Sequence, residues 1–495
     1  MRILFVASEG LPYSKTGGLA DVIEGLPKAL VKLGHEVAVV LPRYRGTKAA
    51  AVVLRSLTIA VGEKLRYPAI GDGGILHGVR YFFVDDLAYF DRAHLYGEHG
   101  KDYPDNAERF GELCRAAIEI AKQMWPAEVL HCHDWQTALV PVLLRSQYAE
   151  DPLLKKIPVV FTIHNIGYQG QCSGEVLADA GIPESVYNPG GLEFYGKVNL
   201  LKGGLVCADY LTTVSRKYAE EIQTEEYGHG LNGVVRERRE RLRGILNGVD
   251  YAEWNPETDA HIAAHYSAKD LSGKRACKQE LLKIFRLRGE NVERPLVGMV
   301  SRFAGQKGFD LIAEKAQEMM KEDLAVAALG TGEARYEHLF RELAKEYPGR
   351  FGVKIAYDNV LAHKIEAGAD IFLMPSRYEP CGLNQIYSLR YGTVPVVRAT
   401  GGLDDTIEEF DLEHGTGTGF KFAEYTGEAL LECLRRALHC YAEEQVWRRI
   451  QMNGMGKDFS WGASAAEYAK LYEEARALRG SGPAAGNQIP AATSK

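Results

Sequence analysis

The sequence lacks any apolar run long enough to span a membrane, and no basic and apolar leader precedes its first strand-like segment. Its eight cysteines are scattered and form no Cys-x-x-Cys pair, which indicates reduced thiols. The net charge of −7 argues against a broad nucleic-acid-binding face. These absences predict a cytoplasmic protein that has neither a membrane nor a nucleic acid as a partner.

Familiar phosphate and metal motifs are missing as well. The stretch Tyr13–Val22, YSKTGGLADV, does not match Gly-x-Gly-x-x-Gly, and Lys15 precedes its glycines, whereas the lysine of a Walker loop follows them. The chain has no Asp-x-Asp pair that would hold a divalent cation on a diphosphate. Any diphosphate ligand must therefore be neutralised by protein cations, and no metal is expected.

Tyr13–Val22 nevertheless has the features of an anion-binding turn. The apolar segment Ile3–Ala7 predicts a buried strand before it, and the apolar spacing of Ala20–Leu33 predicts a helix after it. Adjacent glycines at a helix N-terminus let backbone N–H groups approach a phosphate, and Lys15 adds a full positive charge. An ordinary tight turn with a solvated lysine fits these residues equally well.

The length of 495 residues is too great for one core and indicates two or three domains. Strands and helices alternate in both halves, which predicts an α/β fold with two doubly wound sheets. The turn-rich segment Gly244–Pro256 separates them. We therefore expect domains at 1–250 and 251–462, a helix at 463–479 that returns to the first domain, and a disordered tail at 480–495.

The strands expected in the second half end in chemically active residues, which is where open α/β sheets bind ligands. Arg302 and Lys307 follow the strand at 296–300, and both could reach one diphosphate. Glu379 follows the strand at 371–375, and it could accept hydrogen bonds from ligand hydroxyls. The alternative is that these are surface cations and an exposed carboxylate beside turns.

Other patterns are less specific. The glycine-rich stretch 71–74 predicts a hairpin turn, and Tyr96 and Tyr103 are expected to be exposed loop residues or to stack on sugar rings. His131 and His133 share one face of a strand, but no further ligand cluster accompanies them. We expect no metal there.

Several motifs together resemble the bacterial glycogen and starch synthases, which are retaining glucosyltransferases of the GT-B fold. The resemblance implies two Rossmann-like domains that face each other across a deep cleft, and it runs from residue 1 to about 478. The matching segments are KTGGLADV (15–22), HDWQ (133–136), TIHN (162–165), NGVD (247–250), SRF…QKG (301–308), SRYEPCGLNQ (376–385) and GTVPVVRATGGLDDT (392–406).

The resemblance implies that glucose moves from a nucleotide diphosphate, usually ADP-glucose, to the non-reducing 4-hydroxyl of an α-1,4-glucan such as glycogen or a maltooligosaccharide. In that reaction Lys15 and Gly18 would lie at the phosphates and sugar, while Arg302 and Lys307 would counter the charge of the leaving diphosphate. The remaining roles are those of glucosyl contacts (His164, Glu379, Cys381, Gly382 and Leu383), an adenine contact (Tyr357), cleft residues (Asp134 and Asn247) and supporting residues (Glu9, Asp21 and Asn165).

The sequence departs from relatives of this fold at two positions. Tyr387 stands where many GT-B transferases have a second glutamate, as is usual in this family, and Asn384 stands where several relatives have threonine.

A UDP-sugar transferase, a phosphorylase and a non-catalytic glucan-binding protein are the alternatives. A phosphorylase would need a lysine that binds pyridoxal phosphate, and no sequence pattern indicates one. A non-catalytic protein is disfavoured because the charged residues Lys15, Arg302, Lys307 and Glu379 are all present. We expect no cofactor, and a monomer is the favoured state.

Overall fold

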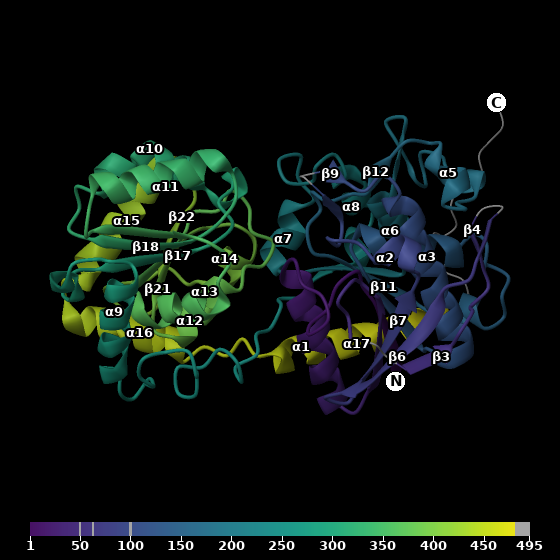
Figure 1. Cartoon of the computed structure of the whole chain (residues 1–495), viewed down its shortest axis with the longest axis horizontal. Coiled ribbons are helices and arrows are strands. Elements are labelled where there is room, and N and C mark those ends of the chain that lie inside the picture. Colours follow the sequence, from purple (N-terminus) through teal and green to yellow (C-terminus); the bar gives the residue numbers. More distant parts are fainter. Residues whose placement is uncertain (49–50, 62–63, 99–100, 481–495) are drawn as a thin grey trace. The chain divides into compact units, whose positions relative to one another are not determined.

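The structure is a computed structural model that describes residues 1–48, 51–61, 64–98 and 101–480. These residues form two compact units. One contains Met1–Gly248 together with helix α17 (Trp461–Gly480), and the other contains Val249–Ser460. In Figure 1 the yellow α17 lies beside the purple α1, so the last described helix packs against the first helix of the chain. The predicted tail lies outside the described residues from residue 481 onward.

The first unit is built on a nine-stranded sheet. Its order is β16-β15-β11-β10-β1-β2-β7-β6-β3. Neighbouring strands from β16 to β7 pair in parallel, whereas β6 pairs antiparallel with both β7 and β3. The strands are β1 (Arg2–Val6), β2 (Glu36–Pro42), β3 (Ala51–Leu54), β6 (Ala69–Leu76), β7 (Val79–Asp85), β10 (Val129–His133), β11 (Val159–Ile163), β15 (Tyr210–Thr213) and β16 (Leu242–Gly244).

Continuous apolar runs explain the central strands, because a parallel sheet is covered on both faces. β1 has the sequence RILFV, and its last four residues are buried. The other helices of the unit are α1 (Gly18–Lys32), α2 (Leu87–Phe90), α3 (Asn106–Glu119), α4 (Leu139–Leu144), α5 (Val176–Asp179), α6 (Leu200–Cys207), α7 (Arg216–Glu221) and α8 (Asn232–Glu237).

Helix α17 completes this unit by close packing on α1. A Cβ atom at Gly25 of α1 would lie 1.9 Å from the indole nitrogen of Trp461, and one at Gly248 would lie 2.5 Å from the Trp461 Cα. Both positions therefore need glycine. The core that α17 covers also contains Tyr468 and Tyr472, which are fully buried.

The second unit has a six-stranded sheet in which every neighbouring pair is parallel, in the order β19-β18-β17-β20-β21-β22. Its strands are β17 (Leu296–Val300), β18 (Ala325–Gly330), β19 (Phe351–Ile355), β20 (Ile371–Met374), β21 (Val394–Arg398) and β22 (Phe420–Phe422). Its helices are α9 (Ser272–Ile284), α10 (Phe309–Met319), α11 (Ala334–Glu346), α12 (Asn359–Gly368), α13 (Asn384–Arg390), α14 (Gly401–Thr406), α15 (Gly427–Tyr441) and α16 (Glu444–Met455).

The hairpin prediction for residues 71–74 is wrong. These glycines lie inside β6, and the chain reverses at His77 and Gly78, which have φ values of 52° and 84°. Two successive positive φ angles are typical of the turn that joins a tight hairpin. The glycines instead accommodate a register shift and the close approach of Phe83, whose ring would lie 2.6 Å from a Cβ at Gly73.

No described helix combines the length and apolar character that a bilayer crossing requires.

Candidate active site

Most of the residues predicted for the site follow the carboxyl ends of parallel strands, where open α/β sheets bind ligands. In the first unit they follow β1 (Glu9, Lys15, Gly18 and Asp21), β10 (Asp134), β11 (His164 and Asn165) and β16 (Asn247). In the second unit they follow β17 (Arg302 and Lys307), β19 (Tyr357) and β20 (Glu379, Cys381, Gly382 and Leu383).

The carboxylate of Glu9 holds the turn before α1 through hydrogen bonds. It accepts hydrogen bonds from the Thr16 backbone N–H at 2.7 Å, the Thr16 hydroxyl at 2.5 Å and the Gly17 backbone N–H at 3.1 Å. Burial raises the pKa of Glu9, and the bonds from Thr16 and Gly17 oppose that rise. Glu9 thus shapes the loop that carries Lys15, and Thr16 is a loop residue that sequence reasoning missed.

Lys15 is held by a neighbouring carboxylate. Its Nζ donates to Asp21 Oδ1 at 2.6 Å, and the Lys15 side chain is 34% exposed. Burial raises the pKa of Asp21, and Lys15 opposes the rise. Because Asp21 lies in the first turn of α1, the pair places an ammonium group at the positive end of that helix. This arrangement suits an anionic ligand.

Asp134 organises the loop after β11. It has φ 57° and ψ −179°, a conformation that costs a non-glycine residue about 1–3 kcal/mol. Its Oδ1 accepts a hydrogen bond from the His164 backbone N–H at 2.7 Å. This bond and a further one from the Asn165 backbone N–H act to lower the pKa of Asp134. A strained carboxylate that binds backbone N–H groups therefore sets the position of His164 and Asn165.

The Asp134 carboxyl predicts a pH-dependent stability. Burial raises its pKa to about 7, whereas an unfolded aspartate has a pKa of about 3.9. Between these values the folded protein binds more protons than the unfolded chain, so the free energy of unfolding falls as pH rises from about 4 to about 7. Asparagine cannot ionise, and its amide oxygen can accept the same backbone hydrogen bonds.

We therefore expect Asp134→Asn to raise the free energy of unfolding by about 2 kcal/mol more at pH 8 than at pH 5, since the partly accessible carboxylate keeps some of its hydration. Urea titrations of the wild type and the variant at the two pH values measure this difference. Equal gains at both pH values would contradict the prediction, because they would show that ionisation of Asp134 has no part in the effect.

His164 is a neutral imidazole beside this loop, because burial lowers its pKa to about 3. His131 and His133 lie behind it in β10 and are fully buried. In the described part of the chain, no group of three or more histidine, cysteine, aspartate or glutamate residues is arranged to hold a metal ion.

In the second unit, Lys307 and Glu379 form a direct ion pair. Lys307 Nζ lies 2.5 Å from Glu379 Oε2, and the Ser376 hydroxyl donates to the same oxygen at 3.1 Å. Glu379 is 6% exposed, so most of its surface is removed from water. The structure thus brings together a cation and a carboxylate that lie 72 residues apart in the sequence, and it adds Ser376, which sequence reasoning did not include.

Glycines support the loops that carry these residues. A Cβ at Gly308 would lie 1.9 Å from the Pro375 carbonyl oxygen, and a Cβ at Gly402 would lie 1.9 Å from the Cys381 carbonyl oxygen. Gly401, Gly308 and Gly382 also have positive φ angles. The pair Gly401-Gly402 therefore packs directly under the backbone of residues 379–381, a role that its position after β21 did not reveal.

The remaining site residues differ in exposure. Arg302 is exposed and donates to Gln306 Oε1 at 3.0 Å. β19 ends at Ile355, so Tyr357 lies in the following loop and is 80% exposed. Asn247 is buried, and its Oδ1 has no hydrogen-bond partner among the described residues.

The expectation that Tyr96 and Tyr103 are exposed is wrong. The Tyr96 hydroxyl lies 2.8 Å from Ser8 Oγ, and burial raises the pKa of Tyr96 well above its ordinary value. The Tyr103 ring lies under the guanidinium groups of Arg92 and Arg109, at 4.7 and 5.3 Å from the ring centre. The polar composition around them concealed these contacts, which form only in the folded chain.

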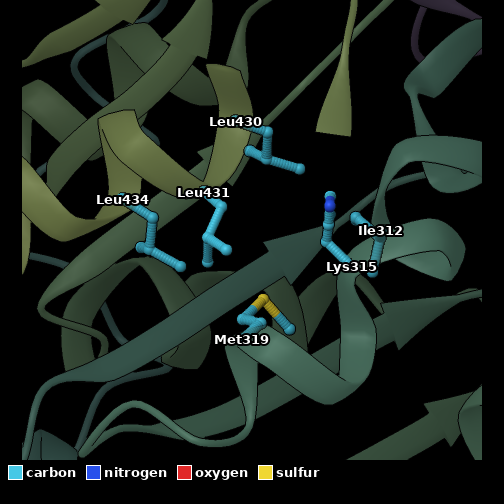
Figure 2. A pocket seen from close by; sticks show the side chains of 6 residues that line it. All are labelled: Ile312, Lys315, Met319, Leu430, Leu431 and Leu434. Atoms are coloured by element: carbon cyan, nitrogen blue, oxygen red, sulfur yellow. The ribbon is translucent and has the colours of Figure 1, made fainter. Parts of the chain in front are cut away.

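A shallow apolar hollow lies between α10 and α15 (Figure 2). Its lining consists of Ile312, Lys315, Met319, Leu430, Leu431 and Leu434, and none of them belongs to the predicted site. Five of the six side chains are apolar, so the hollow lacks the polar groups that would orient a sugar nucleotide.

Two sheets of the Rossmann type, with cations and carboxylates after their strands, define a glycosyltransferase of the GT-B class. Family models agree: residues 2–237 match the starch synthase catalytic domain, and residues 283–451 match glycosyl transferases group 1. The chain belongs to the starch and glycogen synthase family, and it is a glucosyltransferase.

Individual relatives cover nearly the whole chain. A glycogen synthase of Koribacter versatilis is 55% identical over 97% of this chain and 99% of its own length, and one of Anaeromyxobacter sp. is 49% identical over 95% and 99%. The catalytic domain of starch synthase IV from Arabidopsis thaliana, bound to ADP and acarbose, has a TM-score of 0.86 and 34% identity over 96% of this chain and 99% of that one. A sucrose-phosphate synthase from Thermosynechococcus elongatus shares the fold, with a TM-score of 0.61 and 17% identity over 96% and 99%.

Proposed function

We propose that this glucosyltransferase uses ADP-glucose to extend α-1,4-glucans at the non-reducing 4-hydroxyl, with retention of configuration. The similarity to a starch synthase solved with ADP, over 96% of the chain, carries this proposal. It is supported by the full set of charged residues after the strands of both units. We assign the acceptor side to residues 1–250 and the donor side to residues 251–462. The cytoplasmic location and the monomeric state stay predictions.

The leaving diphosphate is the main electrostatic problem of the reaction. Lys15, Arg302 and Lys307 supply the cations that neutralise it. The ion pair with Glu379 holds Lys307 in place before the substrate arrives. In the proposed reaction these charges act as preorganised electrostatic stabilisation, and no metal ion is required.

The sugar is oriented by neutral and acidic groups. We assign Glu379 and the backbone from Cys381 to Leu383 to the glucosyl hydroxyls, and His164 to the glucose near the reacting carbon. Tyr357 is assigned to the adenine, and Asp134 and Asn247 are assigned to the lining of the site, with Glu9, Asp21 and Asn165 as supports and Gly18 close to the phosphates. Retention then proceeds by front-face substitution, in which the departing phosphate helps to deprotonate the incoming hydroxyl.

The test is transfer of labelled glucose to glycogen. We expect label in the polymer with ADP-glucose, at least tenfold less with UDP-glucose, and no loss of activity in EDTA. The tenfold ratio corresponds to about 1.4 kcal/mol of discrimination between the two bases. Equal labelling from UDP-glucose would overturn the donor assignment, and loss of activity in EDTA that Mg²⁺ restores would overturn the metal-free mechanism.

A further inference from the structure

A row of buried side chains extends from His164 into the core of the first unit, and the proposed function assigns no role to them. His133 Nδ1 lies 3.0 Å from His164 Nε2, and the His133 ring lies 4.2 Å from the His131 ring. His131 Nδ1 lies 2.8 Å from the Tyr472 hydroxyl, although the two residues are 341 positions apart. The row therefore runs from the end of β11, through β10, to the C-terminal helix α17.

The row is anchored at each step. His131 Nε2 lies 2.6 Å from the Thr162 hydroxyl, which lies 2.5 Å from the Thr212 hydroxyl. The ring of Phe5 stacks on His133 with 5.5 Å between centroids and an angle of 15°. His131 and His133 are fully buried in the core of the parallel sheet, so their rings have little room to rotate, and water does not weaken the bonds from His131 to Thr162 and from Thr162 to Thr212.

We infer that His133 is a positioning residue that holds the His164 imidazole through its 3.0 Å hydrogen bond. Tyr472 of α17 fixes the other end of the row through its 2.8 Å hydrogen bond to His131. The inference rests on the proposed contact of His164 with the glucose. It assigns to α17 a part in the site beyond covering the sheet.

The shared hydrogen bond has a consequence that can be measured. One nitrogen must donate and the other must accept. Burial lowers the pKa of both histidines, so both rings are neutral. If His133 carries its proton on Nδ1, then His164 Nε2 is the acceptor and His164 also carries its proton on Nδ1. If His164 carries its proton on Nε2, then His133 carries its own on Nε2. The two residues therefore have the same tautomer.

The first experiment is ¹H–¹⁵N NMR of histidine side chains in the unliganded, ¹⁵N-histidine-labelled full chain. We expect His133 and His164 to be neutral and to share one tautomer. The His164 signals should shift in His133→Leu and in Tyr472→Phe. Opposite tautomers, or His164 signals that neither variant moves, would overturn the inference. This readout needs no substrate, so it decides the inference even if the proposed glucosyl transfer fails.

The second experiment measures transfer rates. We expect His133→Leu to lower kcat/KM by roughly tenfold to a hundredfold, as small misplacements of a substrate-binding group do. His133→Asn, which keeps an amide nitrogen close to the Nδ1 position, should recover part of the loss. Tyr472→Phe removes one hydrogen bond, and we expect a loss of about fivefold.

The matched control is Tyr391→Phe in the second unit. It removes a buried tyrosine hydroxyl that donates to Asp259 at 2.5 Å, and we expect it to lower Tm while kcat/KM stays within about twofold of the wild type. If Tyr472→Phe and Tyr391→Phe reduce kcat/KM equally, or if His133→Leu leaves it unchanged, the positioning role is refuted. If His133→Leu does not fold, the kcat/KM of His133→Asn and the histidine tautomers of the wild type still test the positioning role.

Discussion

Lys307→Ala is expected to lower kcat by about a hundredfold to a thousandfold, equivalent to about 2.7–4 kcal/mol of transition-state stabilisation. Negative charge develops on the leaving diphosphate as the glycosidic bond breaks, and Lys307 is held by Glu379 2.5 Å away. Removal of the ammonium group also leaves a nearly buried carboxylate without its cation. The same change at Arg302 is expected to cost a similar amount, because its guanidinium is proposed to bind the same diphosphate.

Initial rates with ADP-glucose and glycogen measure both effects. The matched control is Lys345→Ala, which breaks a lysine–glutamate pair of 2.7 Å on the surface of α11, outside the predicted site. We expect its kcat to equal that of the wild type, since exposed ion pairs contribute little. Turnover within tenfold of the wild type for both Lys307→Ala and Arg302→Ala would refute their assigned role.

Gly402→Ala is the second change with a large expected effect. Its Cβ would lie 1.9 Å from the Cys381 carbonyl oxygen and 2.5 Å from the Cys381 Cα, so the backbone of the loop that carries Glu379 must move. A displacement of about 1 Å at a substrate-binding group costs about a hundredfold in rate. We therefore expect kcat/KM to fall by about that factor, together with a lower Tm.

Gly233→Ala in α8 is the control for this substitution, because no atom lies within 4 Å of its added Cβ. Gly233 is the second residue of the short helix α8 and its φ is not positive, so alanine fits there, and this variant should match the wild type in stability and activity. If Gly402→Ala retains wild-type kcat/KM, the loop tolerates displacement and does not position the glucosyl contacts.

Much of the fold was predictable because it depends on local patterns. Apolar runs such as Ile3–Ala7 and 296–300 become buried parallel strands, since burial on both faces requires apolar side chains throughout. The alternation of helices with strands in the second half, as at α11 (Ala334–Glu346), was also predictable, because the apolar stripe of a helix repeats every 3.6 residues. The family was evident from the motifs, and the family models and relatives confirm it.

Several features of the site depend on tertiary contacts. Nothing near Glu379 in the sequence shows that Lys307 is its partner, or that Gly402 packs below Cys381. The row from His164 to Tyr472 joins β11, β10 and α17 only because the sheet order places β10 beside β11 and the last helix packs against them. The inward position of Tyr96 has the same origin, in a contact with Ser8 across 88 residues.

The sequence by itself determined the two alternating α/β halves, the family, and the strand ends at which charged residues gather, because hydrophobic periodicity and compact motifs are properties of neighbouring residues. Only the tertiary structure decided the reversal at His77 and Gly78, the partners of Glu9 and Lys307, and the histidine row behind His164. These depend on which distant segments share the interior of one sheet, and local propensity carries no information about such pairings.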